Sequence, residues 1–244
     1  MHTFLHRYEL DTSAPTGKEA WRDFAVRVLL PVVGLWVVVV GVGFLITGPL
    51  GGLPSEGAVN RWFVSVRTPA LNSVTAVLSG IGTTEFIIGA CVLFVALFWW
   101  RTKQWWLAIV PAQAIAVQAL VFMTAALVVG RERPDVEHLD DSPPTSAYPS
   151  GHTGASTAFY VTLAMVAQRI GNPVARGVVT VLCLLVPISV GTARLYRGMH
   201  SPTDVTMGAL NGLVCAFLAW NYLRRDVSGA GVGTGAERAR VDQH

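Results

Sequence analysis

Six long apolar segments, separated by shorter polar stretches, dominate the pattern of hydrophobic and polar positions along the chain. They cover residues 28–47, 84–100, 107–130, 151–167, 178–193 and 202–223. A helix rises about 1.5 Å per residue, so about 20 residues cross the roughly 30 Å hydrocarbon core of a bilayer. The pattern therefore predicts an all-α integral membrane protein built as a six-transmembrane-helix bundle.

Two shorter segments after the first span have a different pattern. Apolar residues recur at three-and-four spacing within residues 59–66 and 71–81, and Arg61, Arg67 and Asn72 lie between them. Thr68-Pro69 separates the segments, since the residue before a proline disfavours helical geometry. We interpret both as amphipathic helices in the membrane interface. Helices packed on the surface of the bundle would have the same pattern, and this alternative stays open.

The polar ends of the chain set the predicted domain boundaries. Residues 1–27 are polar and mixed in charge, and we expect a cytoplasmic tail before an uncleaved first span. Residues 28–225 form the predicted six-span membrane domain. Residues 226–244 are rich in glycine and polar side chains, which is typical of a disordered cytoplasmic tail.

Composition supports the membrane assignment and excludes other classes. The chain is 52% hydrophobic and 14% charged, with a mean hydropathy of +0.49, which is too apolar for an ordinary soluble domain. Because no basic tract is interleaved with aromatic residues, we expect no nucleic-acid partner. Cys91, Cys183 and Cys215 lie in apolar runs without metal-ligand spacing, so we expect buried thiols.

Polar residues inside the third span need partners within the bundle. Gln113, Gln118 and Thr124 fall in this otherwise apolar segment. Side chains of this kind hydrogen-bond between neighbouring helices in a membrane. We expect that role for all three.

The distribution of Lys and Arg predicts the orientation in the membrane. Six spans place both termini on one side, and that side carries twelve of the basic residues against six on the other. The twelve are Arg7, Lys18, Arg22, Arg27, Arg101, Lys103, Arg169, Arg176, Arg224, Arg225, Arg238 and Arg240. The six are Arg61, Arg67, Arg131, Arg133, Arg194 and Arg197. The positive-inside rule then predicts cytoplasmic termini at a plasma membrane.

Three polar clusters, within residues 131–134, 149–152 and 194–204, share the opposite, extracytoplasmic side. Ionisable groups at a membrane edge indicate a functional site. Arg133 and Arg194 are permanent cations suited to multidentate binding of phosphate. Ser150 can cap the fourth span and Gly151 permits close approach, so the helix start can also bind an anion. A plain helix cap would explain Ser150 and leave His152 without a role.

The third cluster places an imidazole four residues before a carboxylate. Asp204 could reach an N–H of His200 across one helical turn and fix its tautomer. Asp204 also stands three residues after Ser201, which is the spacing of a capping box. The two roles are compatible, and both remain open.

Three segments resemble the signature motifs of the type 2 phosphatidic acid phosphatases. They are Arg133-Pro134, Pro149-Ser150-Gly151-His152 and the run from Arg194 through His200 to Asp204. This family comprises integral-membrane lipid phosphatases related to vanadium haloperoxidases. The resemblance implies that His200 is the nucleophile, that Asp204 orients it and that His152 is the general acid. It also implies that Arg133, Ser150, Gly151 and Arg194 bind the phosphoryl oxygens. No metal and no other cofactor is implied.

The sequence departs from the family pattern at two positions. Ala126 stands where the first motif has a lysine, and Ala193 where the third has a serine. We expect Arg131 to supply the missing phosphate-binding cation. In a regular helix it would point roughly 140° away from the face of position 126. Pro134, however, favours an exit from the helix after Gly130, which would redirect Arg131.

These observations predict a membrane phosphatase acting on a lipid phosphate in the bilayer, through a phosphohistidine intermediate on the extracytoplasmic face. A polyprenyl diphosphate, phosphatidic acid and phosphatidylglycerol phosphate are the candidate substrates. One alternative is a catalytically weakened family member that acts in lipid binding or transport. A vanadate-dependent oxidising enzyme is another.

Overall fold

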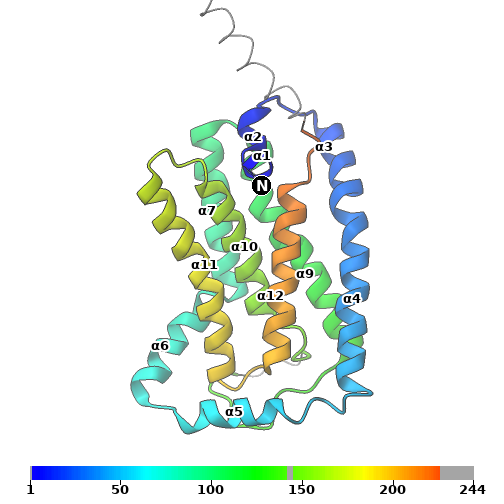
Figure 1. Cartoon of the computed structure of the whole chain (residues 1–244), viewed down its shortest axis with the longest axis vertical. Helices are drawn as coiled ribbons and strands as arrows, with labels where there is room; N and C mark the ends of the chain where they lie inside the picture. Colours follow the sequence, from blue (N-terminus) through cyan, green and yellow to red (C-terminus); the bar gives the residue numbers. More distant parts are fainter. Residues whose placement is uncertain (1, 142–144, 226–244) are drawn as a thin grey trace, which may run out of the picture.

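The structure is a computed structural model that describes residues 2–141 and 145–225, and throughout these ranges the regular structure is helical. Figure 1 shows a bundle of long, nearly parallel helices with shorter helices at both ends. The helices are α1 (His2–Leu5), α2 (Arg7–Leu10), α3 (Gly17–Phe24), α4 (Leu30–Thr47), α5 (Glu56–Ser65), α6 (Pro69–Gly80), α7 (Thr84–Thr102), α8 (Trp105–Ala108), α9 (Val110–Val129), α10 (Gly151–Ala167), α11 (Pro173–Tyr196) and α12 (Pro202–Trp220). A π-helical turn, Ala25–Leu29, joins α3 to α4.

Five of the described helical segments are long and apolar enough to cross a membrane, and they contain α4, α7, α9, α11 and α12. The remaining expected span corresponds to α10, which is shorter and lies among α9, α11 and α12. Small residues allow this close packing, because a Cβ at Gly212 of α12 would lie 2.3 Å from the backbone oxygen of Gly154 of α10. The all-helical membrane fold predicted from the sequence is confirmed.

Helices α5 and α6 lie across one end of the bundle (Figure 1). As expected, α6 begins at Pro69, where the side chain of Thr68 accepts a hydrogen bond from the backbone of Leu71 at 3.2 Å. Asn60 of α5 and Thr75 of α6 are buried against the bundle, whereas Trp62 is exposed. The two helices therefore pack on the bundle and also present apolar side chains outward, which combines the two sequence interpretations.

The N-terminal segment expected as a tail forms α1, α2 and α3, which pack at the opposite end of the bundle. Tyr8 is buried and donates its hydroxyl to the backbone oxygen of Trp220 at 2.9 Å. Trp220 in turn donates its indole N–H to the backbone oxygen of Phe4 at 2.9 Å. The chain thus begins beside the end of α12 (Figure 1). The predicted tail of residues 226–244 lies outside the described residues.

Polar residues of α9 differ in their partners. Thr124 accepts a hydrogen bond from the indole of Trp36 on α4 at 2.9 Å, as expected for an interhelical group. Gln118 joins the helices through its backbone oxygen, which accepts from Asn211 of α12 at 3.2 Å. Its side-chain nitrogen is buried and has no partner among the described residues, so the expected side-chain bridge is not formed.

Candidate active site

The predicted site residues gather at the end of the bundle covered by α5 and α6. The start of α10, the start of α12 and the end of α11 meet there. One hydrogen bond joins the first two, since the backbone N–H of Ser150 donates to the backbone oxygen of Asp204 at 2.9 Å. Ser150 caps α10, and its hydroxyl lies 3.0 Å from that of Thr153. The first N–H groups of a helix have no partner within it, so the start of α10 offers donors that suit an anion.

A cavity of about 310 Å³ opens beside the start of α10. One part of its wall is polar and is formed by Arg133, His152, Arg194 and His200, with Gly151 beside them. The rest of the wall is mainly apolar and includes Ile87, Ile88, Ile115, Ala119, Phe122 and Met123. Residues far apart in the sequence thus form one chamber that is cationic at one end and apolar at the other.

Two guanidinium groups that line this cavity, of the buried Arg194 and the half-buried Arg133, have unused donors. Arg133 donates from Nη1 to the backbone oxygen of Met199 at 2.8 Å, and Arg194 donates from Nη1 to Asp140 at 2.8 Å and Ser79 at 2.9 Å. The Nε atoms of both arginines are buried without a hydrogen-bond partner among the described residues. Unpaired buried N–H groups are costly, so a ligand with anionic oxygens would satisfy them.

His200 lines the cavity, and a hydrogen bond fixes the tautomer of its imidazole. Its Nδ1 lies 2.8 Å from the backbone oxygen of Ala147, and a carbonyl only accepts, so Nδ1 carries the hydrogen. In the neutral ring Nε2 then has the free lone pair. Burial, reinforced by the positive charges of Arg194 and Arg133, lowers the pKa of His200 well below its ordinary value. The imidazole is therefore neutral at pH 7.

The expected contact between Asp204 and His200 is replaced by other partners. Oδ2 of Asp204 is 4.0 Å from Nδ1 of His200 and accepts instead from the backbone N–H of Ser201 at 2.7 Å. This is the capping arrangement that the sequence offered as the second role. Oδ1 accepts from Arg131 at 2.7 Å, so each carboxylate oxygen has a closer partner than the imidazole.

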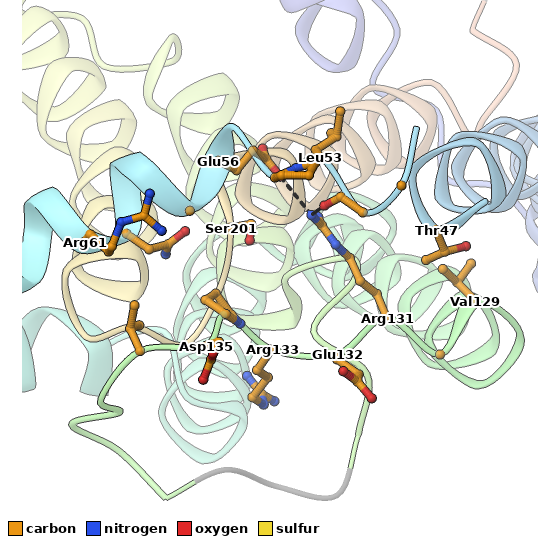
Figure 2. A pocket seen from close by; sticks show the side chains of 18 residues that line it. Thr47, Leu53, Glu56, Arg61, Val129, Arg131, Glu132, Arg133, Asp135 and Ser201 are labelled. Carbon is orange, nitrogen blue, oxygen red and sulfur yellow. Dashed lines mark hydrogen bonds and ion pairs between the residues drawn. The ribbon is translucent and has the colours of Figure 1, made fainter. Parts of the chain in front are cut away.

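The expectation that Arg131 binds phosphate stays a prediction; in the structure its guanidinium donates to protein acceptors, two of them carboxylates. Figure 2 shows its guanidinium directed toward Glu56 of α5, at 2.8 Å. It also donates to Thr203 at 2.7 Å, to Asp204, and to the backbone oxygen of Gly52 at 2.9 Å. Burial would lower the pKa of Arg131, but the two carboxylates outweigh this effect and raise it. Both terminal nitrogens are thus occupied by protein acceptors.

Ala126, which stands where the family pattern has a lysine, lies close to the candidate site. It lines a second cavity, of about 770 Å³, together with Arg133 and Ser146. A lysine at this position would extend toward Arg133. Arg131 lines the same cavity, and both of its terminal nitrogens donate to protein acceptors.

Sequence reasoning missed three groups that organise the site. Asp140 joins Arg194 to Arg197, accepting from Arg197 Nε at 2.8 Å. Burial would raise the pKa of Asp140, but the two arginines outweigh it and keep this pKa below its usual value. The other two groups are the carboxylate of Glu56, which accepts from Arg131, and the backbone carbonyl of Ala147, which contacts His200. Asp140 is one of four acidic residues within residues 135–141, and Glu56 precedes the amphipathic segment predicted over residues 59–66, so no local signal marked either one.

A family model described as the PAP2 superfamily matches residues 105–228, which is about half of the chain and includes all three motif clusters. The chain belongs to the PAP2 superfamily. Phosphatidylglycerophosphatase B of Bacillus subtilis (strain 168) is 26% identical over 177 residues, covering 69% of this chain and 83% of that protein.

Two solved structures share the fold. The transmembrane PAP2 type phosphatidylglycerolphosphate phosphatase from Bacillus subtilis superposes with a TM-score of 0.67 at 21% identity, covering 78% of this chain and 92% of that one. LpxE of Aquifex aeolicus superposes with a TM-score of 0.54 at 21% identity, covering 66% of this chain and 92% of the other.

Proposed function

We propose that this protein is a membrane lipid phosphatase, a phosphoric ester hydrolase that cleaves a phosphomonoester or diphosphate of a lipid. The observation that carries the proposal is the single cavity in which His152, His200, Arg133 and Arg194 adjoin an apolar wall. The polar end suits a phosphoryl group and the apolar wall suits the attached hydrocarbon. Membership of the PAP2 superfamily and the names of the similar proteins support this assignment.

The proposed reaction has two steps. Nε2 of His200 attacks phosphorus and forms a P–N bond while the P–O bond to the lipid breaks, and His152 donates a proton to the departing oxygen. His152 then removes a proton from water, whose oxygen attacks phosphorus and breaks the P–N bond. Inorganic phosphate leaves and His200 regains its lone pair.

Positioning and charge stabilisation account for the remaining groups. Arg133, Arg194 and the backbone at Ser150 and Gly151 bind the phosphoryl oxygens, over which the charge of the transition state is spread. Asp204 has no bond to the imidazole, so in this proposal it positions His200 through the chain that it caps at Ser201.

The proposed substrate is a lipid phosphate in the plasma membrane, with a polyprenyl diphosphate, phosphatidic acid and phosphatidylglycerol phosphate as candidates. We propose that the site faces the extracytoplasmic side. The excess of Lys and Arg on the side of the termini supports this orientation.

The test is phosphate release from these lipids by the purified protein. We expect His200→Ala to abolish release and Asp204→Asn to reduce it less, because Asn retains part of the cap. His6→Ala, at the opposite end of the bundle, is the matched control. Rapid acid-free quenching of the wild type should trap phosphate on His200. Release by His200→Ala at the wild-type rate would refute the covalent mechanism.

A second candidate function is lipid binding or transport by a catalytically weakened family member. Ala126 in place of the motif lysine favours it, because one phosphate-binding cation is missing. In that case the wild type would bind lipid phosphates and release no phosphate from any of them.

A further inference from the structure

Gln118 is a polar group in the apolar part of the active-site cavity. It lies on α9 among Ile115, Ala119 and Phe122, all of which line the same cavity. The residue is 1% exposed, and its side-chain nitrogen has no hydrogen-bond partner among the described residues. Buried polar groups are almost always paired, so an unpaired amide inside a ligand cavity requires an explanation.

The position of Gln118 is tightly constrained. A Cβ at Gly154 of α10 would lie 2.2 Å from its side-chain nitrogen, so the amide rests directly against that backbone. Gly154 follows Gly151 by three residues, which places it about 4–5 Å further along α10 from the phosphate-binding end. One turn of α9 nearer that end, the ring of Phe122 packs against Gly151. The amide therefore lies just beyond the phosphoryl position.

We propose that Gln118 is a specificity-determining residue that selects glycerol-linked lipid phosphates, an inference that rests on the proposed function. The amide nitrogen is buried without a hydrogen-bond partner among the described residues, and a lipid that fills the cavity also excludes water from its neighbourhood. The bound lipid must then supply a polar atom at the same depth. A lipid without one leaves the amide unpaired, and sites of this kind discriminate strongly against such ligands.

Glycerolipids have a suitable atom and prenyl lipids do not. In an acylglycerol phosphate, the carbon beside the one that bears the phosphate carries an ester or hydroxyl oxygen. In a prenyl phosphate, the corresponding part of the chain carries only carbon and hydrogen. The amide of Gln118 can donate to or accept from the oxygen of the first class.

The experiment compares two phosphomonoesters that differ in these oxygens. The probes are a diacylglycerol phosphate and phytanyl monophosphate, a branched saturated hydrocarbon chain with one phosphate. Phosphate release and thermal stabilisation by each lipid are measured with the full chain in detergent. The variants are Gln118→Leu and Gln118→Met, of which Met is closest to glutamine in shape. Gln113→Leu is the matched control, since Gln113 lies on the same helix and does not line this cavity.

We expect Gln118→Leu and Gln118→Met to lower kcat/KM for the diacylglycerol phosphate by about 5- to 100-fold, the range for one buried hydrogen bond. The rate with phytanyl monophosphate should stay unchanged or rise, which also shows that the variants are folded. Gln113→Leu should leave the ratio of the two substrates unchanged.

Equal changes for both lipids, or no change for either, would overturn the assignment of Gln118. The stabilisation measurement separates this failure from that of the proposed function. Selective stabilisation by the diacylglycerol phosphate that depends on Gln118, without phosphate release from either lipid, would preserve the inference and refute the phosphatase. Phosphate release from both lipids that the Gln118 variants leave unchanged would refute the inference and preserve the phosphatase.

Discussion

At the scale of single residues, the backbone carbonyl of Ala147 determines the chemistry of His200. Its contact at 2.8 Å places the hydrogen on Nδ1 and leaves the lone pair of the neutral ring on Nε2. Burial and two arginines keep the ring neutral by lowering its pKa. The imidazole thus has its tautomer and charge state without direct help from the carboxylate of Asp204.

This arrangement predicts an unusual titration. Because the pKa of His200 is lowered, protonation should begin only as the pH falls well below 6.5, the ordinary value for histidine. The neutral, nucleophilic form should therefore persist through pH 6.5, and its loss should reduce activity only in more acidic solution. Nitrogen NMR of histidine-labelled protein, with the signal assigned by His200→Ala, measures both the tautomer and the midpoint. A midpoint at or above 6.5 would contradict the structure.

At the scale of helices, a buried ionic cluster joins α5 to the start of α12. Glu56 accepts from Arg131 at 2.8 Å and from the backbone N–H of Thr203 at 2.7 Å, while Arg131 also pairs with Asp204. The side chains of Glu56 and Arg131 are 11% and 8% exposed. Since α12 also carries the cap next to His200, this cluster connects an interfacial helix to the active site.

We expect Glu56→Gln to lower the unfolding free energy by about 2 kcal/mol, because it leaves a buried guanidinium short of one counter-charge. Glu137→Gln is the matched control, since Glu137 is 75% exposed in its pair with Arg67 and its loss should cost no more than about 0.5 kcal/mol. Unfolding in a mild detergent measures both. Equal losses for the two variants would show that burial does not strengthen the cluster.

At the scale of the whole molecule, the candidate site and the N-terminal helices lie at opposite ends of the bundle (Figure 1). The described part of the chain ends beside its beginning, because Arg225 donates to the backbone oxygen of Ser13 at 2.6 Å. The side of the membrane that the candidate site faces decides which lipid pool it can reach.

Cysteine labelling tests the proposed orientation. The native thiols, Cys91, Cys183 and Cys215, are first replaced by alanine. A membrane-impermeant reagent should label Asp135→Cys, at the site end, in intact cells. It should label Arg101→Cys, at the other end, only after permeabilisation. Labelling in the reverse order would show that the site faces the cytoplasm.

The sequence by itself determined the class of fold and the chemical groups of the site. Runs of apolar residues long enough to cross a bilayer are local features, and so is the break at Pro69, so each could be read from consecutive positions. Motif spacing identified His152, His200, Arg133 and Arg194, which the structure brings together.

Only the tertiary structure decided which partner each polar group has. Arg131 and Arg133 are two residues apart, yet one binds Glu56 and Asp204 and the other lines the cavity. The spacing of His200 and Asp204 allowed a contact that the carbonyl of Ala147 makes instead. Hydrogen-bond partners depend on chain segments that meet only after folding. An apolar pattern specifies which residues are buried, and the packing of helices specifies what they face.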